Sequence, residues 1–215
     1  PVNFTNTGTI AGVTWLWNFG SGATPATSTV QDPAGIVYST AGTKIITLTT
    51  TNSITGCAST TTQTININQT PTASFTSNAP QCAASGVNFT NTGSTGGSWS
   101  FLWDFGIDAL PQTSTSENPV GVLYSSGGTK TITLTISNGF CTQTSIQTIT
   151  INATPLSTFS STAPQCTGLP VNFTNTGTIT GVTWAWDFGS GSTPATSTAQ
   201  DPTGIVYSTA GTKII

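Results

Sequence analysis

Side chains that could carry out chemistry are scarce in this sequence. Its 215 residues include six acids, three lysines and four cysteines, but no histidine, arginine or methionine. Without histidine there is no imidazole base, no Ser-His-Asp triad and no histidine-bound metal, and no nucleophile has a base partner. One loop could gather two carboxylates, those of Asp104 and Asp108, and calcium takes its oxygens from such groups. We therefore expect no enzyme and no cofactor, with this loop as the metal candidate.

The charge balance excludes further classes of function. Only 4% of the residues are charged, while 49 are Thr and 24 are Ser. Three lysines cannot neutralise a nucleic-acid backbone, so we expect no nucleic-acid partner. No run of about 18 apolar residues occurs, so we expect no insertion into a membrane. Such a surface also lacks the lysines that usually keep strand edges apart, which favours pairing with neighbouring copies.

The sequence repeats itself with a period of 83 to 86 residues. The string VNFTNTG begins at residues 2, 87 and 171, and an aromatic string follows each copy: WLWNFG at 15, FLWDFG at 101 and WAWDFG at 184. Residues 1–46 and 170–215 are identical at 40 of 46 positions. A fixed period of this kind indicates tandem domains, and neither end resembles a capping repeat. We expect the sequence to be a window on a longer array.

Each repeat has the apolar alternation of β-strands. Trp15, Trp17 and Phe19 fall on one face of a predicted strand, with Leu16 on the other. In residues 129–138, TKTITLTISN, apolar residues alternate with threonine, and Gly, Pro, Ser and Asn separate the apolar segments. Six or seven short strands in about 85 residues predict an all-β fold of β-sandwiches. We expect the aromatic stripe to be core and not a sugar-binding platform, because the opposite face of the strand carries no aromatic residue.

The string Trp-Asp-Phe-Gly, a loop with proline, and then Tyr-Ser-x-x-Gly-x-Lys resembles the signature of the PKD domain, an immunoglobulin-like sandwich. The resemblance covers essentially the whole chain in three in-phase copies. It departs from the family at Ser21 and Ser190, which replace a frequent Asp, and at three apolar residues that replace a His before the Tyr. The resemblance implies a core made of the signature residues Trp17, Phe19, Tyr38, Trp103, Phe105, Tyr124, Trp186, Phe188 and Tyr207.

Cysteines and asparagines suggest covalent modification. An even number of cysteines without a CxxC motif indicates disulfides in an oxidising compartment, and the candidates are Cys57, Cys82, Cys141 and Cys166. Pairing within a repeat would join Cys82 to Cys141, whereas pairing across repeat boundaries would join Cys57 to Cys82 and Cys141 to Cys166. We favour the first because it makes each domain autonomous, although a simple sandwich puts those two loops at opposite ends. Possible glycosylation sites, also expected by chance in a chain so rich in Asn and Thr, are Asn3, Asn68, Asn88, Asn152 and Asn172.

The sequence thus predicts a bead-on-string array of PKD-type sandwiches. The predicted domains are 1–70, with its first strand missing; 71–154, which is complete; and 155–215, with its last strands missing. The family implies an extracellular or cell-surface spacer or adhesive module, so we expect the shaft of a filament or of a long surface adhesin. Its partners would be neighbouring repeats, further copies and surface glycan. Two alternatives are an accessory binding module of a secreted hydrolase, and an ice-binding surface made of Thr-x-Thr rows.

Overall fold

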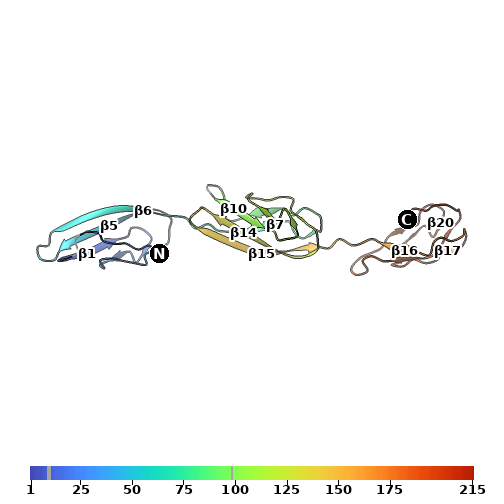
Figure 1. Ribbon diagram of the computed structural model, residues 1–215, viewed down its shortest axis with the longest axis horizontal. Helices are drawn as coiled ribbons and strands as arrows, with labels where there is room; N and C mark the ends of the chain where they lie inside the picture. The colour runs from blue at the N-terminus through green and yellow to red at the C-terminus, as the bar shows by residue number, and fades with distance from the viewer. Residues whose placement is uncertain (9–10, 98) are drawn as a thin grey trace. The chain divides into compact units, whose positions relative to one another are not determined.

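The computed structural model describes residues 1–8, 11–97 and 99–215, and every regular element in those ranges is a β-strand (Figure 1). The all-β expectation is confirmed. The chain divides into two compact units, residues 1–125 with 129–151 and residues 126–128 with 152–215. Across the described ranges, no helix has the length and apolar character needed to cross a membrane.

The middle repeat is a sandwich of two layers. One layer is a sheet in the order β12-β10-β14-β15-β8, and the other contains the antiparallel pairs β7–β9 and β11–β13. The strands are β7 (Phe75–Ser77), β8 (Gln81–Cys82), β9 (Phe89–Asn91), β10 (Ser100–Asp104), β11 (Ala109–Leu110), β12 (Thr113–Ser114), β13 (Leu123–Tyr124), β14 (Gly128–Ser137) and β15 (Thr142–Asn152).

Side-chain alternation decides which residues fill this sandwich. Trp103 on β10 lies opposite Leu134 on β14, and both are fully buried. Phe75 and Phe89 reach the same core from the β7–β9 layer. Leu102, one residue from Trp103, points outward and is 53% exposed, because neighbouring residues on a strand face opposite sides.

The first repeat follows the same plan with a four-stranded sheet in the order β3-β1-β5-β6 and the pair β2–β4. Its core contains Trp17, Phe19, Ile36 and Ile46. Its last strand begins well before the isoleucines that predicted it, because Thr60, Thr62 and their neighbours pair with β5 along its length. The strands are β1 (Val13–Asn18), β2 (Ala23–Thr24), β3 (Thr27–Ser28), β4 (Val37–Tyr38), β5 (Gly42–Asn52) and β6 (Ala58–Ile67).

The third repeat has shorter strands around a core of Val171, Phe173, Phe188 and Ile205. Its sheets are β16–β18, β17-β22-β20 and β19–β21, and residues 208–215 form no strand. The strands are β16 (Phe159–Ser161), β17 (Pro170–Val171), β18 (Phe173–Asn175), β19 (Trp186–Asp187), β20 (Ser192–Thr193), β21 (Thr196–Ser197) and β22 (Ile205–Tyr207).

Candidate functional site

The recurring aromatic residues hold the cores together. In the middle repeat, Phe105 stacks on Phe89 with ring centroids 4.9 Å apart, and Phe75 meets Trp103 edge-on at 5.1 Å. The indole of Trp103 also donates a hydrogen bond to the Ser116 carbonyl at 2.9 Å, so its polar atom is satisfied inside the repeat. Of the signature residues, the fully or almost fully buried ones are Trp17, Phe19, Trp103, Phe105, Tyr124 and Phe188, and the half-buried ones are Tyr38, Trp186 and Tyr207.

The acid of the Trp-Asp-Phe-Gly string caps its own turn. The Asp104 Oδ1 atom accepts a hydrogen bond from the Gly106 N–H at 2.9 Å, and Asp187 does the same with Gly189. Asn18 caps the first copy with the same 2.9 Å bond to Gly20 N–H. Since the cap needs only a carbonyl-type oxygen, Asn can replace Asp here. The sequence-based prediction of this cap is confirmed.

Asp104 and Asp108 have different partners. Asp108 forms an ion pair with Lys130, whereas Asp104 closes the turn. Glycine occupies the Asp108 position in the other two copies, at Gly22 and Gly191. In the part of the chain that the structure describes, no group of three or more His, Cys, Asp or Glu residues gathers that could hold a metal ion.

A lysine lies over the corner tyrosine in every repeat, a contact that was not predicted from the sequence. The Nζ atoms of Lys44 and Lys130 are each 5.7 Å from the ring centroids of Tyr38 and Tyr124, and Lys213 is 5.5 Å from Tyr207. This is cation–π geometry. The recurring Tyr-Ser-x-x-Gly-Thr-Lys string was the signal that could have predicted it.

The tyrosine hydroxyls differ between repeats. Tyr38 donates to the Phe19 carbonyl at 2.9 Å, and Tyr207 donates to the Phe188 carbonyl at 3.0 Å. The Tyr124 hydroxyl is buried and has no hydrogen-bond partner within the described residues. Burial, and then the negative charge of Asp108, raise the pKa of Tyr124 well above its ordinary value, and burial alone raises the pKa of the other two tyrosines.

The sequon asparagines of the VNFTNTG strings have a structural task. The Asn88 Oδ1 atom accepts a hydrogen bond from Gly121 N–H at 2.8 Å, 33 residues away. Asn3 and Asn172 make the same contact with the equivalent glycines at 2.8 and 2.9 Å. All three are exposed, as are Asn68 and Asn152. Glycosylation of the five sites stays a prediction.

Amide and carboxylate caps join distant loops, which was not predicted from the sequence. Asn91 N–H donates to Asn118 Oδ1 at 2.9 Å, and the equivalent acceptor in the first repeat is Asp32 at 2.7 Å. Asp201 accepts in the third repeat at 2.8 Å. The signal is the Asp-Pro or Asn-Pro pair that recurs in each copy. These contacts fix the loops at one end of each sandwich.

The four cysteines are free thiols, of which Cys141 is half-buried and the others are exposed. Cys57 and Cys141 belong to the turns that join the last two strands of their repeats. Cys82 and Cys166 lie early in their repeats, Cys82 on β8 and Cys166 between β16 and β17. The preferred pairing of Cys82 with Cys141 does not fit the middle repeat, because the two residues lie near opposite ends of the sandwich. Disulfide formation itself stays a prediction.

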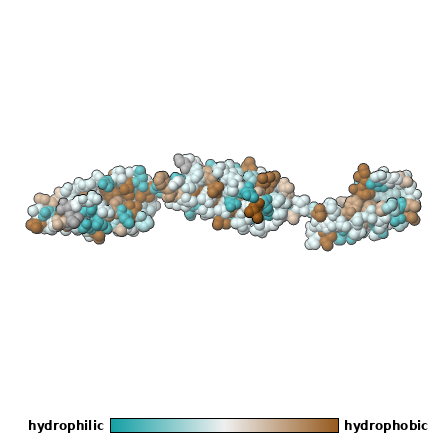
Figure 2. All heavy atoms as spheres, viewed as in Figure 1, coloured by the Kyte–Doolittle hydropathy of each residue, from teal (hydrophilic) through white to brown (hydrophobic). Residues whose placement is uncertain are grey.

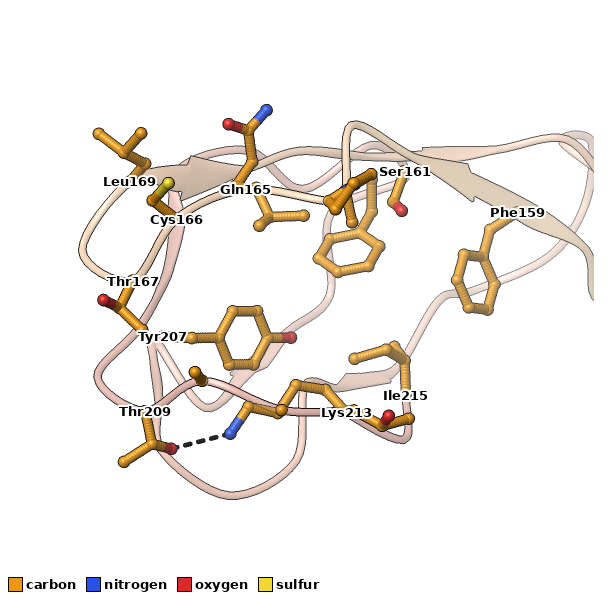
Figure 3. Close-up of a pocket in the computed structure, with 17 residues that line it drawn as sticks. Phe159, Ser161, Gln165, Cys166, Thr167, Leu169, Tyr207, Thr209, Lys213 and Ile215 are labelled. Atoms are coloured by element: carbon orange, nitrogen blue, oxygen red, sulfur yellow. Dashed lines mark hydrogen bonds between the residues drawn. The ribbon is translucent and has the colours of Figure 1, made fainter.

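A hollow of about 710 Å³ opens in the third repeat (Figure 3). Phe159, Phe173, Tyr207 and Ile215 are among its lining residues, and Lys213 donates to Thr209 at its rim at 2.9 Å. The residues equivalent to Phe159, Phe173 and Tyr207 in the middle repeat are covered by the apolar residues of β14 and β15, Ile132, Leu134, Ile136 and Ile151. The hollow is therefore an uncovered core face and not a pocket shaped for a small molecule.

Threonines dominate the outward face of the large sheets. Asn18, Thr47 and Thr62 form one row across three strands, and the hydroxyls of Thr49 and Thr60 meet at 3.2 Å in the next row. Thr135 and Thr144 make the same 3.2 Å contact in the middle repeat. Figure 2 shows a largely pale surface of intermediate hydropathy on the visible face, with scattered apolar and hydrophilic spots.

These features define an immunoglobulin-like β-sandwich with buried signature residues. Residues 68–153 match the family model described as PKD domain, so the chain contains a PKD domain in that range. Among solved structures, the chain is similar to the amphioxus IgVJ-C2 molecule at 11% identity and a TM-score of 0.34, covering 69% of this chain and 95% of that one. No curated protein matches the chain significantly. A PKD domain indicates a non-catalytic structural or binding module.

Proposed function

We propose that the chain is a run of three PKD-type repeats, residues 1–70, 71–154 and 155–215, that serves as the shaft of an extracellular filament or long surface adhesin. The recurrence of VNFTNTG and of the aromatic strings supports three copies of one plan. PKD domains are typically extracellular, which supports the location. The proposed partners are neighbouring repeats, further copies of the chain and, for an adhesin, surface glycan.

One observation carries this proposal: the recurring polar and aromatic side chains contact their own repeat. Trp103 and Phe105 fill the core, Asp104 caps its turn, and Asn88 and Asn118 tie loops together. A binding module would instead present such groups on an exposed surface. The outward faces of the large sheets in the first and middle repeats present rows of threonine hydroxyls with almost no charge.

That surface suits lateral or end-to-end association. Neutral hydroxyls and amides can pair with those of a neighbour, and salt has little charge to screen. The edge strands also carry few of the lysines that normally prevent strands from joining those of another molecule. Association between copies should therefore depend weakly on ionic strength.

The proposal can be tested with the purified chain by electron microscopy and by depletion from solution on insoluble cellulose and chitin. We expect threads to form at high protein concentration to a similar extent in low and molar salt, with no depletion on either polysaccharide. Saturable depletion would favour the accessory module of a hydrolase. Separate particles at every concentration would refute the filament, and thermal hysteresis would identify an ice-binding surface instead.

A further inference from the structure

Two of the four cysteines lie at the end where the chain enters a repeat, here named the leading end. In the middle repeat, the turn between β14 and β15 holds Cys141, whose carbonyl accepts a hydrogen bond from Asn138 N–H at 3.2 Å. The incoming segment touches this turn: Asn138 Nδ2 donates to the Gln69 carbonyl at 2.9 Å, and Cys141 Sγ lies 4.0 Å from the Asn68 carbonyl oxygen. Cys57 occupies the equivalent turn of the first repeat.

The other two cysteines lie at the opposite end, here named the trailing end. Two residues after Cys82, the Ala84 N–H donates to the Tyr124 carbonyl at 2.9 Å. Tyr124 lies close to the start of β14, because Lys130 covers its ring. Gly127, just before β14, is so close to Ala153 that a Cβ atom on it would lie 2.5 Å from the Ala153 nitrogen. Ala153 directly follows β15, the last strand of the repeat, so the chain leaves the repeat at this end.

Cys166 has the surroundings of Cys82 in the third repeat. Gly168 N–H donates to the Tyr207 carbonyl at 3.1 Å, in the place of Ala84 and Tyr124. The carbonyl of Cys166 accepts from Leu169 N–H at 3.1 Å, and that of Cys82 accepts from Ser85 N–H at 3.0 Å. Both cysteine positions thus recur after 84 residues, from 82 to 166 and from 57 to 141.

The length of a repeat separates its leading and trailing cysteines. Lys130 marks the trailing end of β14 and Asn138 the leading end, and eight residues of strand span about 26 Å. A disulfide needs Cα atoms within about 7 Å of each other. Cys82 and Cys141 therefore cannot bond to each other in a folded repeat, so a disulfide at either position would need a partner from elsewhere.

We propose that the trailing-end cysteine of one repeat bonds to the leading-end cysteine of a repeat in a second copy of this chain, which makes the end-to-end contact covalent. This inference deepens the proposed function and rests on it. Head-to-tail association of like units brings opposite ends together at every contact, so each junction contains one cysteine of each kind. Cys57 is exposed at the leading end, as Cys82 and Cys166 are at the trailing end, so Cys57 is expected to react before the half-buried Cys141.

The bond forms by thiol–disulfide exchange. The thiolate of one cysteine attacks oxidised glutathione and releases reduced glutathione, and the second cysteine thiolate then displaces the remaining glutathione. Two thiols are oxidised to one disulfide, and one oxidised glutathione is reduced to two thiols, so electrons and protons balance. An oxidising extracellular compartment provides such a disulfide oxidant.

The test uses two double variants of the full chain in a glutathione redox buffer. C57S/C141S keeps only trailing-end cysteines, and C82S/C166S keeps only leading-end cysteines; C57S/C82S keeps one of each and serves as the matched control. We expect mixed double variants to give about tenfold more covalent dimer than either alone, a preference of about 1.4 kcal/mol. The control should form covalent oligomers without mixing, and the unaltered chain should form a ladder on a non-reducing gel.

Peptide mapping of the disulfide-linked oligomer bands should find bonds that join Cys57 or Cys141 to Cys82 or Cys166. A Cys82–Cys141 bond within a monomer would overturn the inference, as would equal yields from mixed and separate variants, or glutathione adducts without protein–protein bonds. The variant with serine at all four positions separates the two proposals. If it still forms threads while the unaltered chain forms no disulfides, the filament stands and the covalent junction fails. Depletion on polysaccharide would refute the filament without changing the disulfide map.

Discussion

Removing the hydroxyl of the corner tyrosine should have different effects in two repeats of the same chain. The Tyr38 hydroxyl donates to the Phe19 carbonyl at 2.9 Å, whereas that of Tyr124 is buried and lacks a partner among the residues described. A net hydrogen bond contributes about 1 kcal/mol, so Tyr38→Phe should destabilise the first repeat by about that amount. A buried unpaired hydroxyl costs about 1–3 kcal/mol, so Tyr124→Phe should leave the middle repeat unchanged or stabilise it by about 1 kcal/mol.

Hydrogen exchange read by mass spectrometry measures this difference, because peptides report the opening free energy of each repeat separately. The ring, its burial and the lysine above it remain in both variants, so the hydroxyl is the only change. Tyr207→Phe provides a control, since its hydroxyl donates to the Phe188 carbonyl at 3.0 Å and the third repeat should weaken as the first does. If Tyr124→Phe destabilises the middle repeat as much as Tyr38→Phe destabilises the first, the assignment of an unpaired hydroxyl is wrong.

Three further outcomes are expected. Stability should fall as the pH rises above about 10, because burial in the folded chain raises the pKa of all three tyrosines above 10.0 and the unfolded chain therefore loses its phenolic protons first. Thermal unfolding followed by circular dichroism on either side of that pH checks this, and an unchanged unfolding midpoint would contradict it. Asp108→Ala should destabilise the middle repeat by about 1–3 kcal/mol, because it leaves the partly buried charge of Lys130 without its carboxylate. In hydrogen-exchange experiments, the double variant Asp108→Ala/Lys130→Met should recover most of that loss. Equal losses in the single and the double variant would show that the ion pair is not the cause. Gly93→Ala should cost about 1–3 kcal/mol in urea unfolding, because the new Cβ would lie 2.0 Å from the Thr72 carbonyl oxygen, whereas Thr90→Ala on an exposed strand position should cost about 0.5 kcal/mol or less.

The cores were predictable because they depend on local alternation. Trp17 and Phe19 fall on one face of a strand by spacing alone, and a face that carries such residues in a sandwich must be buried. The same alternation correctly placed Leu16 on the outside, at 52% exposure. The turn cap of Asp104 was predictable for a similar reason, since its acceptor and donor are two residues apart.

Contacts between distant loops could not be predicted from spacing. Asn88 binds the backbone of Gly121, and Asp108 meets Lys130, only because the topology brings their strands together. The pairing of Cys82 with Cys141 was favoured for the autonomy of each domain, against the expectation that a sandwich puts those loops at opposite ends, and the fold separates the two residues. The domain boundaries, the disulfides and the glycans stay predictions.

The lysines have a consequence for the resistance of the chain to proteases. Trypsin-like proteases cut after lysine or arginine, and this sequence offers them three lysines in 215 residues. Lys44 is 4% exposed, the Lys130 side chain is 11% exposed, and Lys213 is half-buried, each with its ammonium group over a tyrosine ring. An enzyme of this specificity therefore cannot cleave after Lys44 or Lys130 until the repeat opens, so the folded first and middle repeats should resist it, whereas the bond after Lys213 lies in a strand-free segment and is less protected.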